Sequence, residues 1–318
     1  MHSQIVITMI LIADGGSTKI HWSLVTASGQ TTDVRTDGIN PLFQTSDAMR
    51  NSVSNQLLPQ IAPLLWAGTL THVFFYGAGC TPEKKVFVEK ALQAVFKKAE
   101  IHVESDMLGA ARGLLGHNPG VACILGTGSG SCFYNGENIE WCVPSLGYIL
   151  GDEGSAAVLG KRLVGDLLKN QLDPSPITNH QSPITNLKDL FFSEYNTSMA
   201  DIIEHVYRQP FPNRYLASLS KFCADHLDDE RIYNLVYDHF IQFIRRNLHQ
   251  YFPNEKIGKC ENEKITKCVG FTGSIAYYYR PVLEKAMAAE GLAISQIMQD
   301  PIEGLKLYHK DAIVPTTE

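Results

Sequence analysis

Two glycine-rich turns are the stretches of this sequence best suited to binding an anion. The first, Asp14–Lys19, reads Asp-Gly-Gly-Ser-Thr-Lys, and the second, Gly126–Ser131, reads Gly-Thr-Gly-Ser-Gly-Ser. Glycines allow tight turns and leave backbone N–H groups free to face an anion. Asp14, at the mouth of the first turn, could hold a hydrated Mg²⁺ ion. Alone, the first turn fits an ordinary β-turn as well as a phosphate-binding hairpin; together, the two could clamp the phosphates of a nucleotide.

Three acids lie at the starts of expected helices, and one of them, Asp106, also follows an expected strand. For Asp106, one interpretation is a helix N-cap, and the other is a general base that takes the proton of an attacking hydroxyl. Such a base typically contributes roughly 10²–10⁴-fold in rate, and the two roles are compatible. Asp152 and Glu153 lie between glycines before another expected helix. They fit either capping or hydrogen bonding to sugar hydroxyls.

The sequence lacks the motifs of several other kinds of binding and catalytic site. No G-x-x-x-x-G-K-[ST] motif is present, so the chain is not a P-loop protein. The second turn has G-x-G-x-G spacing and leads into a strand, which excludes a dinucleotide-binding fingerprint. The 11 histidines form no H-x-x-x-H or H-E-x-x-H pattern and imply no zinc chemistry. No G-x-S-x-G elbow indicates a serine hydrolase.

Both turns are expected between strands. Met9–Ala13 and Ile20–Ala27 flank the first turn, and Val121–Leu125 and Cys132–Tyr134 flank the second. With a further strand at 34–36, the chain opens as an antiparallel meander and not as the β-α-β unit of a dinucleotide-binding domain. The repeat of strand, glycine turn and strand indicates an internal duplication of one fold.

The remaining chain alternates helices and buried strands. Ser46–Trp66 is predicted helical, with Ser46 as N-cap and with prolines 59 and 63 breaking or kinking its later part. We expect a helix over Pro82–Lys98, a strand over Leu292–Ile297 and a terminal helix over Pro301–His309. The polar stretch 171–186 contains Ser-Pro-Ile-Thr-Asn twice and is interpreted as a surface insertion without a catalytic role.

The bulk composition is that of a globular α/β protein. The chain has 318 residues, of which 44% are hydrophobic and 19% charged, enough for two domains and a large core. A net charge of -6 argues against a general nucleic-acid binder. Seven cysteines without a C-x-x-C pair favour reduced thiols and a cytoplasmic location. No signal peptide or membrane-spanning stretch is recognised.

Six motifs fall in the order seen in the BadF/BadG/BcrA/BcrD ATPase family, and the chain resembles its N-acetylglucosamine kinase-like branch. The motifs span residue 9 to about residue 276, and the pairing of Gly-Thr-Gly-Ser with Gly-Asp-Glu-Gly-Ser is the most specific. They are Asp14–Lys19, Gly38–Pro41, Asp106–Ala110, Gly126–Ser129, Gly147–Ser155 and Gly273–Ala276.

The resemblance implies two ribonuclease H-like domains of the actin-like ATPase fold, with ATP in a central cleft. It implies transfer of the γ-phosphoryl group to the 6-hydroxyl of an amino sugar, most simply N-acetylglucosamine, with ATP and Mg²⁺ as cofactors. We expect the N-terminal domain to comprise residues 1–113 and about 292–318, and the C-terminal domain residues 114–291 with an insertion at 171–188. Neither a nucleic acid nor a membrane is an expected partner, and a homodimer is left open.

Residue roles follow from the same resemblance. Asp106 would be the base, and Asp14 would hold Mg²⁺ through water. Phosphates would meet Gly16, Ser17, Thr18, Lys19, Thr127 and Gly128; adenosine would meet Gly273 and Ser274; the sugar would meet Asn40, Ser129, Gly147 and Asp152.

Two positions depart from the family pattern, and both bear on the sugar. Gly130 replaces the Asn that often follows Gly-Thr-Gly-Ser, and Leu146 replaces a Trp of the animal enzymes. N-acetylmuramate and glucosamine are therefore alternative substrates. A non-catalytic nucleotide-sensing protein is the alternative outside sugar phosphorylation. An electron-activating ATPase of the same family is disfavoured, because no cysteine pair is set to share a cluster.

Overall fold

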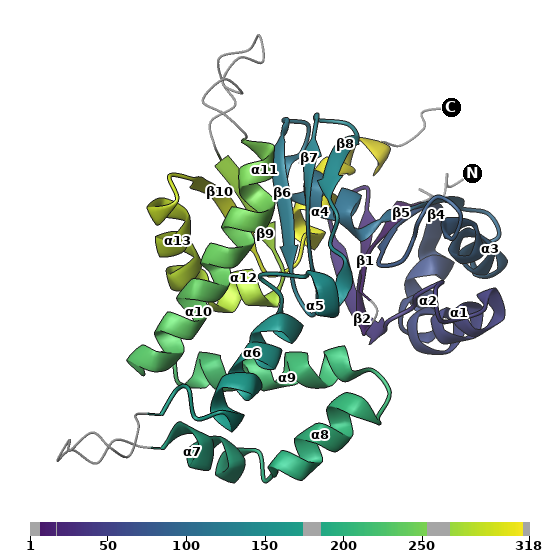
Figure 1. The fold of residues 1–318 in the computed structure, drawn as a ribbon. Coiled ribbons are helices and arrows are strands. Elements are labelled where there is room, and N and C mark those ends of the chain that lie inside the picture. The colour runs from purple at the N-terminus through teal and green to yellow at the C-terminus, as the bar shows by residue number, and fades with distance from the viewer. Residues whose placement is uncertain (1–6, 17, 174–185, 253–267, 314–318) are drawn as a thin grey trace, which may run out of the picture. The chain divides into compact units, whose positions relative to one another are not determined.

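Two compact α/β units make up the chain. The computed structural model describes residues 7–16, 18–173, 186–252 and 268–313. Contacts group residues 1–122, 132–140 and 300–318 into a first unit, and residues 123–131 and 141–299 into a second. The described residues form two five-stranded sheets, each flanked by helices (Figure 1). The predicted α/β class with two domains of one kind is confirmed.

The first sheet has the strand order β3-β2-β1-β4-β5. β1 and β2 are antiparallel, as are β2 and β3, whereas β4 runs parallel to β1 and β5 parallel to β4. The predicted antiparallel opening is thereby confirmed. The strands are β1 (Ile7–Gly15), β2 (Lys19–Thr26), β3 (Thr31–Asp37), β4 (Gly68–Gly77) and β5 (Glu100–Ser105).

Helices cover both faces of this sheet (Figure 1). A buried core that includes Leu11, Trp22 and Phe75 packs against α1, α2 and α3 on one face. On the other face, α4 lies against β4, and Gly109 allows the close approach because a Cβ there would lie 2.6 Å from the Tyr76 Cβ. The helical elements are α1 (Ser46–Ser52), the π-helix η1 (Val53–Leu57), α2 (Leu58–Ala67), α3 (Lys85–Val95), α4 (Asp106–Leu115), α14 (Ile302–Tyr308) and a 3₁₀ helix (Lys310–Ile313).

Strand alternation sends Asp14 to the face opposite the main core. Successive side chains of a strand point to opposite faces, so the core residues Leu11 and Ala13 share one face and Asp14 lies on the other. The strand register then aligns a polar row across the sheet. It runs Arg35 on β3, His21 on β2, Asp14 on β1, Tyr76 on β4 and Glu104 on β5.

The second sheet repeats the arrangement of the first. Its order, β8-β7-β6-β9-β10, places its strands as third, second, first, fourth and fifth in chain order, as in the first sheet. This supports the internal duplication that the sequence indicates. The strands are β6 (Gly120–Leu125), β7 (Ser129–Tyr134), β8 (Ile139–Val143), β9 (Cys268–Thr272) and β10 (Ala293–Met298).

A longer helical segment separates β8 from β9 than separates β3 from β4. Within it, α6 and α9 pack closely, because a Cβ on Gly160 would collide with the Leu216 carbonyl. The helices are α5 (Gly147–Leu150), α6 (Ala156–Leu168), α7 (Leu187–Glu194), α8 (Met199–Tyr207), α9 (Pro212–Asp225), α10 (Glu230–Phe243), the π-helix η2 (Ile244–Leu248), α11 (His249–Tyr251), α12 (Ser274–Tyr278) and α13 (Arg280–Ala289). Most of the predicted insertion at 171–188 lies outside the described residues.

Three sequence-based details differ from the structure. Thr45, not Ser46, caps α1, because its side chain accepts the Ala48 N–H at 3.3 Å. α3 begins at Lys85, so Pro82 lies in the preceding turn and not in the helix. The domain boundary expected near residue 292 would assign β10 to the first unit, whereas β10 pairs in parallel with β9 and belongs to the second.

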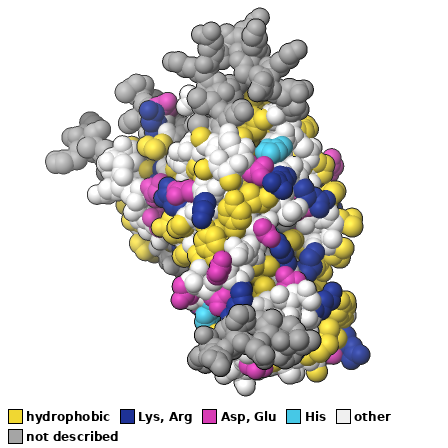
Figure 2. All heavy atoms as spheres, turned by 60° about the vertical axis from the view of Figure 1, so that its left-hand side comes forward, with side chains coloured by type: hydrophobic (Ala, Val, Ile, Leu, Met, Phe, Trp, Pro, Cys, Tyr) yellow, Lys and Arg dark blue, Asp and Glu magenta, His cyan; other side chains and the backbone are white. Residues whose placement is uncertain are grey.

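The face of the molecule in Figure 2 carries mixed charge. On the face shown in Figure 2, acidic and basic side chains are interspersed around apolar ones, and the coloured residues there form no extended basic area. This matches the net charge of -6. Within the described residues, no helix has both the length and the apolar character needed to cross a membrane.

Candidate active site

The first glycine-rich turn joins β1 to β2. The Gly16 N–H donates to the Lys19 carbonyl at 2.9 Å, and the Gly38 N–H donates to the Thr18 carbonyl at 3.0 Å. Gly15 must lack a side chain, because a Cβ there would lie 2.7 Å from the Phe75 ring. Thr18 and Lys19 are exposed, so their side chains are open to a ligand. Ser17 lies outside the described residues.

Asp14 is half-buried at the end of β1 among other acids. The pKa of its carboxyl is raised from 3.8 to about 7, first by burial and then by the charges of Asp300 and Asp106, while His21 and Arg35 oppose the rise. A carboxylate crowded by like charges favours any cation that binds beside it. This environment fits the Mg²⁺ site expected at Asp14, since Mg²⁺ prefers oxygen ligands and keeps several of its waters.

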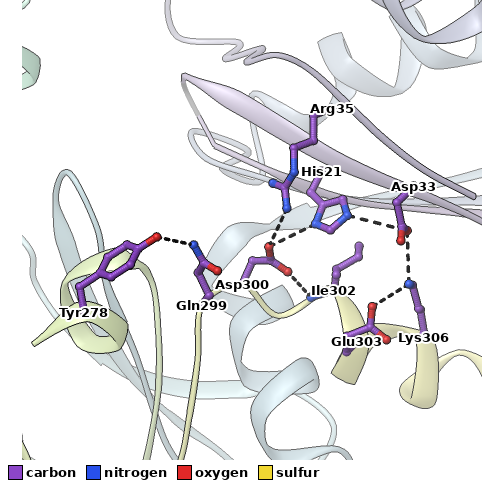
Figure 3. Close-up of polar contacts among 9 residues, drawn as sticks. All are labelled: His21, Asp33, Arg35, Tyr278, Gln299, Asp300, Ile302, Glu303 and Lys306. Carbon is purple, nitrogen blue, oxygen red and sulfur yellow. Dashed lines mark hydrogen bonds and ion pairs between the residues drawn. The ribbon is translucent and has the colours of Figure 1, made fainter. Parts of the chain in front are cut away.

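Asp300 is held in place by a polar network that includes His21 and Arg35 (Figure 3). Its Oδ2 lies 3.2 Å from His21 Nδ1 and accepts from Arg35 Nη2 at 3.4 Å. Burial alone would raise the pKa of Asp300, but the hydrogen bonds from His21 and Arg35 outweigh it and hold the pKa below its ordinary value. Asp300 therefore remains an anion. On its other side, His21 Nε2 lies 3.7 Å from Asp33 Oδ1, which is 3.3 Å from Lys306 Nζ.

Asp106 is the first residue of α4 and does not cap it. The N-cap is Ser105, whose hydroxyl accepts the Leu108 N–H at 3.2 Å, so the N-cap interpretation of Asp106 is wrong. Asp106 Oδ1 instead accepts the N–H of Met107 at 2.9 Å. Burial raises the pKa of this carboxyl, and the backbone hydrogen bonds oppose the rise. A raised pKa strengthens a carboxylate as a proton acceptor, which suits a general base.

Asn40 is fixed within a short turn after β3. It is buried, its N–H donates to Gln44 Oε1 at 2.8 Å, and its Oδ1 accepts the Leu42 N–H at 2.9 Å. Gly79, in the loop after β4, packs against its amide. Gly79 has a φ of +77°, and a Cβ there would collide with Asn40 Oδ1. The orientation of this amide is therefore set by a glycine from another part of the first unit.

The second glycine-rich turn joins β6 to β7 in the second unit. The Gly126 N–H donates to the Gly128 carbonyl at 2.9 Å, which closes this turn over two residues, whereas the Gly16 to Lys19 bond closes the first turn over three. The N–H of Ala156 donates to the Gly126 carbonyl at 2.8 Å and so ties the turn to the start of α6. Thr127 is exposed at the tip.

The carboxyl of Asp152 is contacted by the other residues of the second unit that are predicted to bind the sugar. Backbone hydrogen bonds from Ser129 and Gly147 reach its carboxyl, and a Cβ on Gly128 would lie 3.0 Å from its Oδ2. Burial raises its pKa to about 6, against the effect of those amides. Its own backbone is held in the left-handed region at φ 55°.

Neither Asp152 nor Glu153 caps the helix that follows. The N-cap of α6 is Ser155, whose hydroxyl accepts the Val158 N–H at 3.2 Å, so the capping interpretation of both acids is wrong. Glu153 instead pairs with Arg246 Nε at 2.9 Å, and its carbonyl accepts the Ser129 hydroxyl at 2.7 Å.

The remaining two predicted residues lie at the end of β9. Gly273 has a φ of +107°, and a Cβ there would collide with the Leu125 carbonyl at the end of β6. Its N–H donates to the Met298 carbonyl at 3.2 Å. Ser274 begins α12 directly after it. Gly273 therefore lets the chain leave β9 close to the second glycine-rich turn.

Comparison with known proteins identifies the superfamily. A candidate N-acetylglucosamine kinase from Porphyromonas gingivalis shares 41% identity and a TM-score of 0.84, over 96% of this chain and 100% of that one. This chain belongs to the actin-like ATPase sugar kinases. Its placement in the BadF/BadG/BcrA/BcrD family stays a prediction, since no protein-family model and no curated protein sequence matches the chain.

Two more distant structures share the sugar-kinase fold. A candidate N-acetylglucosamine kinase from Chromobacterium violaceum is 17% identical with a TM-score of 0.66, over 96% of this chain and 99% of that one. A ROK family glucokinase from Streptomyces griseus, in complex with glucose and AMPPNP, is 13% identical with a TM-score of 0.50, over 96% of this chain and 98% of that one. At such identities, the likeness shows the fold alone.

The residue of this sugar kinase that sequence reasoning missed is Asp300. Like Asp106, it follows a strand and precedes a helix, which is the one local signal that could have drawn attention to it. Its neighbours His21 and Arg35 lie 279 and 265 residues earlier in the sequence. No sequence spacing connects residues so far apart.

Proposed function

We propose that the chain phosphorylates the 6-hydroxyl of an amino sugar with ATP, with N-acetylglucosamine as the simplest substrate. The observation that carries the proposal is the Asp106 carboxylate, which lies at the start of α4 with a raised pKa and influences the charge of Asp14. The similar chain from Porphyromonas gingivalis, named as a candidate N-acetylglucosamine kinase, supports the choice of sugar. The glucokinase structure with AMPPNP supports ATP as the phosphoryl donor.

In the first unit, Asp106 would accept the proton of the sugar hydroxyl as that oxygen attacks the γ-phosphorus. Asn40 would orient the sugar through its amide. Gly16, Ser17, Thr18 and Lys19 would bind phosphate oxygens, and Asp14 would hold Mg²⁺ through water. Mg²⁺ bound with ATP neutralises charge on the phosphates. The raised pKa of Asp14 supports a cation there, because a positive charge favours its ionised form.

In the second unit, Thr127 and Gly128 would bind phosphate oxygens through a hydroxyl and backbone amides. Gly273 and Ser274 would flank the adenosine. Ser129, Gly147 and Asp152 would bind the sugar, and the backbone contacts of Ser129 and Gly147 with the Asp152 carboxyl support their assignment to one site. Phosphoryl transfer requires mainly positioning and charge neutralisation, which a set of turns and carboxylates supplies.

A panel of sugars tests the substrate. Full-length enzyme is mixed with Mg-ATP and N-acetylglucosamine, N-acetylmuramate, glucosamine or glucose, and ADP release is measured. We expect N-acetylglucosamine to give the highest kcat/KM. A preference for one of the other amino sugars would move the assignment to that sugar. If no sugar raises ADP release above the rate in water, the kinase proposal is wrong and the nucleotide-sensing alternative gains support.

Asp106→Asn tests the base. The variant should lower kcat by roughly 10²–10⁴-fold and leave the KM for ATP nearly unchanged, because the amide cannot accept the proton. Glu104→Gln is the matched control: it removes a carboxylate from the same strand end, where Glu104 pairs with Lys85 at 3.0 Å. Full activity of Asp106→Asn would disprove the assignment of the base.

A further inference from the structure

Three potential metal ligands lie together on β4 and β5, apart from the residues assigned to catalysis. His72 Nε2 is 3.6 Å from Glu100 Oε2, and His102 Nε2 is 3.3 Å from Glu100 Oε1. One ligand atom from each of the three side chains lies within 4.8 Å of the others. Two imidazoles and a carboxylate are a ligand set that divalent transition metals favour.

The strand register explains why the three side chains meet. His72 on β4 is the direct partner of Glu100 on β5. His102 follows Glu100 by two residues, so it lies on the same face of the sheet. The Phe74 ring stacks on both imidazoles, with centroids 5.7 Å from His72 and 4.9 Å from His102. The backbone and one aromatic ring therefore hold the imidazoles in place.

The hydrogen bonds of Thr71 favour one tautomer of His72. The Thr71 hydroxyl donates its hydrogen to the Met9 carbonyl at 3.2 Å. Its oxygen, 3.0 Å from His72 Nδ1, can then accept from the tautomer that carries its proton on Nδ1. In the neutral ring, the lone pair of Nε2 therefore faces the Glu100 carboxylate. Two acceptors that face each other are stabilised by a proton or a metal ion between them.

We propose that His72, Glu100 and His102 bind a divalent transition-metal ion such as Zn²⁺. The arrangement matches the usual pattern of metal-binding histidines, in which one ring nitrogen ligates and the other donates to a neighbouring oxygen. Zinc bonds of about 2.0–2.2 Å are reached by small rotations of these partly exposed side chains. Mg²⁺ is not the expected ion, because it prefers oxygen ligands.

The expected role of the ion is to join β5, the edge strand of the first sheet, to β4. β5 leads through Ser105 directly into Asp106. A bound metal would therefore stabilise the strand that carries the proposed base. Sequence spacing did not reveal this site, because its ligands come from two strands and form no H-x-x-x-H pattern.

Metal titration of the untagged, full-length protein tests the proposal. After treatment with a chelator and dialysis, we expect the chain to take up about one equivalent of Zn²⁺ by calorimetry and elemental analysis. Co²⁺ at the site should show a d–d spectrum without a thiolate charge-transfer band. The apparent Tm should rise with free Zn²⁺, since an ion that binds the folded state stabilises it.

Variants identify the ligands. Glu100→Gln changes an exposed side chain and His102→Ala a partly exposed one. Each should weaken Zn²⁺ binding by at least about tenfold, since the loss of supporting contacts alone costs that much. Thr71→Val keeps the side-chain shape but removes the acceptor for Nδ1, and should weaken binding by about 10–100-fold. His205→Ala, an exposed histidine of α8, is the control and should not change it.

Two results would overturn the proposal. The first is an absence of Zn²⁺ binding in the wild-type protein, in which case protonated imidazoles alone would balance Glu100. The second is equal binding by the wild type, Glu100→Gln and His102→Ala, which would place the ion elsewhere in the chain. Circular dichroism of each variant separates loss of ligand from loss of fold.

Discussion

The Asp300 carboxylate lies 3.2 Å from Nδ1 of His21. His21 is also the cross-strand partner of Asp14, so the C-terminal segment and the first glycine-rich turn share one histidine. Asp300 raises the pKa of Asp14, whereas His21 lowers it. The charge state of the proposed Mg²⁺ site thus depends on a residue that follows β10.

Asp300→Asn should lower the pKa of Asp14 from about 7 towards its ordinary value, because it removes the largest charge that opposes ionisation. Carboxyl ¹³C NMR titration would measure the change, and the acidic limb of Mg-ATP-dependent activity should shift to lower pH. Glu303→Gln is the control, since Glu303 pairs with Lys306 and is not among the charges that act on Asp14. An unchanged titration in Asp300→Asn would contradict the network.

Asp14→Asn should make the free energy of unfolding less dependent on pH. The pKa of Asp14 is raised from 3.8 to about 7 in the folded state, so the folded protein binds the proton more tightly than the unfolded one. Its contribution to stability is then fully present below pH 3.8 and is lost as the pH rises through 7. Because a shift of one pKa unit corresponds to about 1.36 kcal/mol, this loss of stability is at most about 4 kcal/mol.

Denaturant unfolding at several pH values measures this difference between wild type and Asp14→Asn. The variant should be the more stable protein near pH 8, where the wild type carries a crowded carboxylate. Asp311→Asn removes an exposed acid from the C-terminal 3₁₀ helix and serves as the comparison. Parallel pH profiles for wild type and Asp14→Asn would refute the expected linkage.

Sugar binding should weaken below about pH 6. The pKa of Asp152 is raised to about 6, and its protonation would remove an acceptor for sugar hydroxyls. The KM for the sugar should therefore rise as the pH falls through this value, while Asp152→Asn should show a high KM without that dependence. In Glu153→Gln the transition should move to lower pH, because Glu153 raises the pKa of Asp152. A flat KM profile in the wild type would argue against Asp152 as a sugar ligand.

Gly79→Ala should raise the KM for the sugar by about tenfold, which corresponds to the loss of about one hydrogen bond from a displaced Asn40. The new methyl group would collide with Asn40 Oδ1. Gly29→Ala separates this collision from backbone strain. Gly29 has a similar φ of +81° but no atom within 4 Å of a Cβ, so its replacement should cost only stability, about 1 kcal/mol. Steady-state kinetics and thermal unfolding of both variants make the comparison.

Short sequence patterns predicted several turns and strands of this structure correctly. Glycines at 15 and 16 and at 126 and 128 indicated two tight turns, because few other residues allow them, and both turns are present between strands. The apolar run before Asp14 indicated a buried strand, and the early hairpins indicated an antiparallel opening. The position of Asp106 at a junction of strand and helix was also evident from the sequence. The roles of these residues in catalysis remain proposals.

The sequence did not show which of two neighbouring residues is the N-cap of a helix. Asp106, Asp152 and Ser46 each fitted an N-cap, yet Ser105, Ser155 and Thr45 occupy those positions. Neighbouring residues with similar capping ability differ little in energy, about 1 kcal/mol or less. Packing of the helix against its unit therefore decides which of them caps it.

The sequence by itself determined the turns, the strand alternation and the face of β1 on which Asp14 lies, because these depend on residues close together in the chain. Only the tertiary structure decided that Asp14 is aligned with His21 and Tyr76 across the sheet. It also decided that Asp300 contacts His21, and that His72, Glu100 and His102 lie close together. Those relationships depend on strand register and on the docking of the C-terminal segment. Both are set by the packing of residues that are distant in sequence, which a local pattern does not encode.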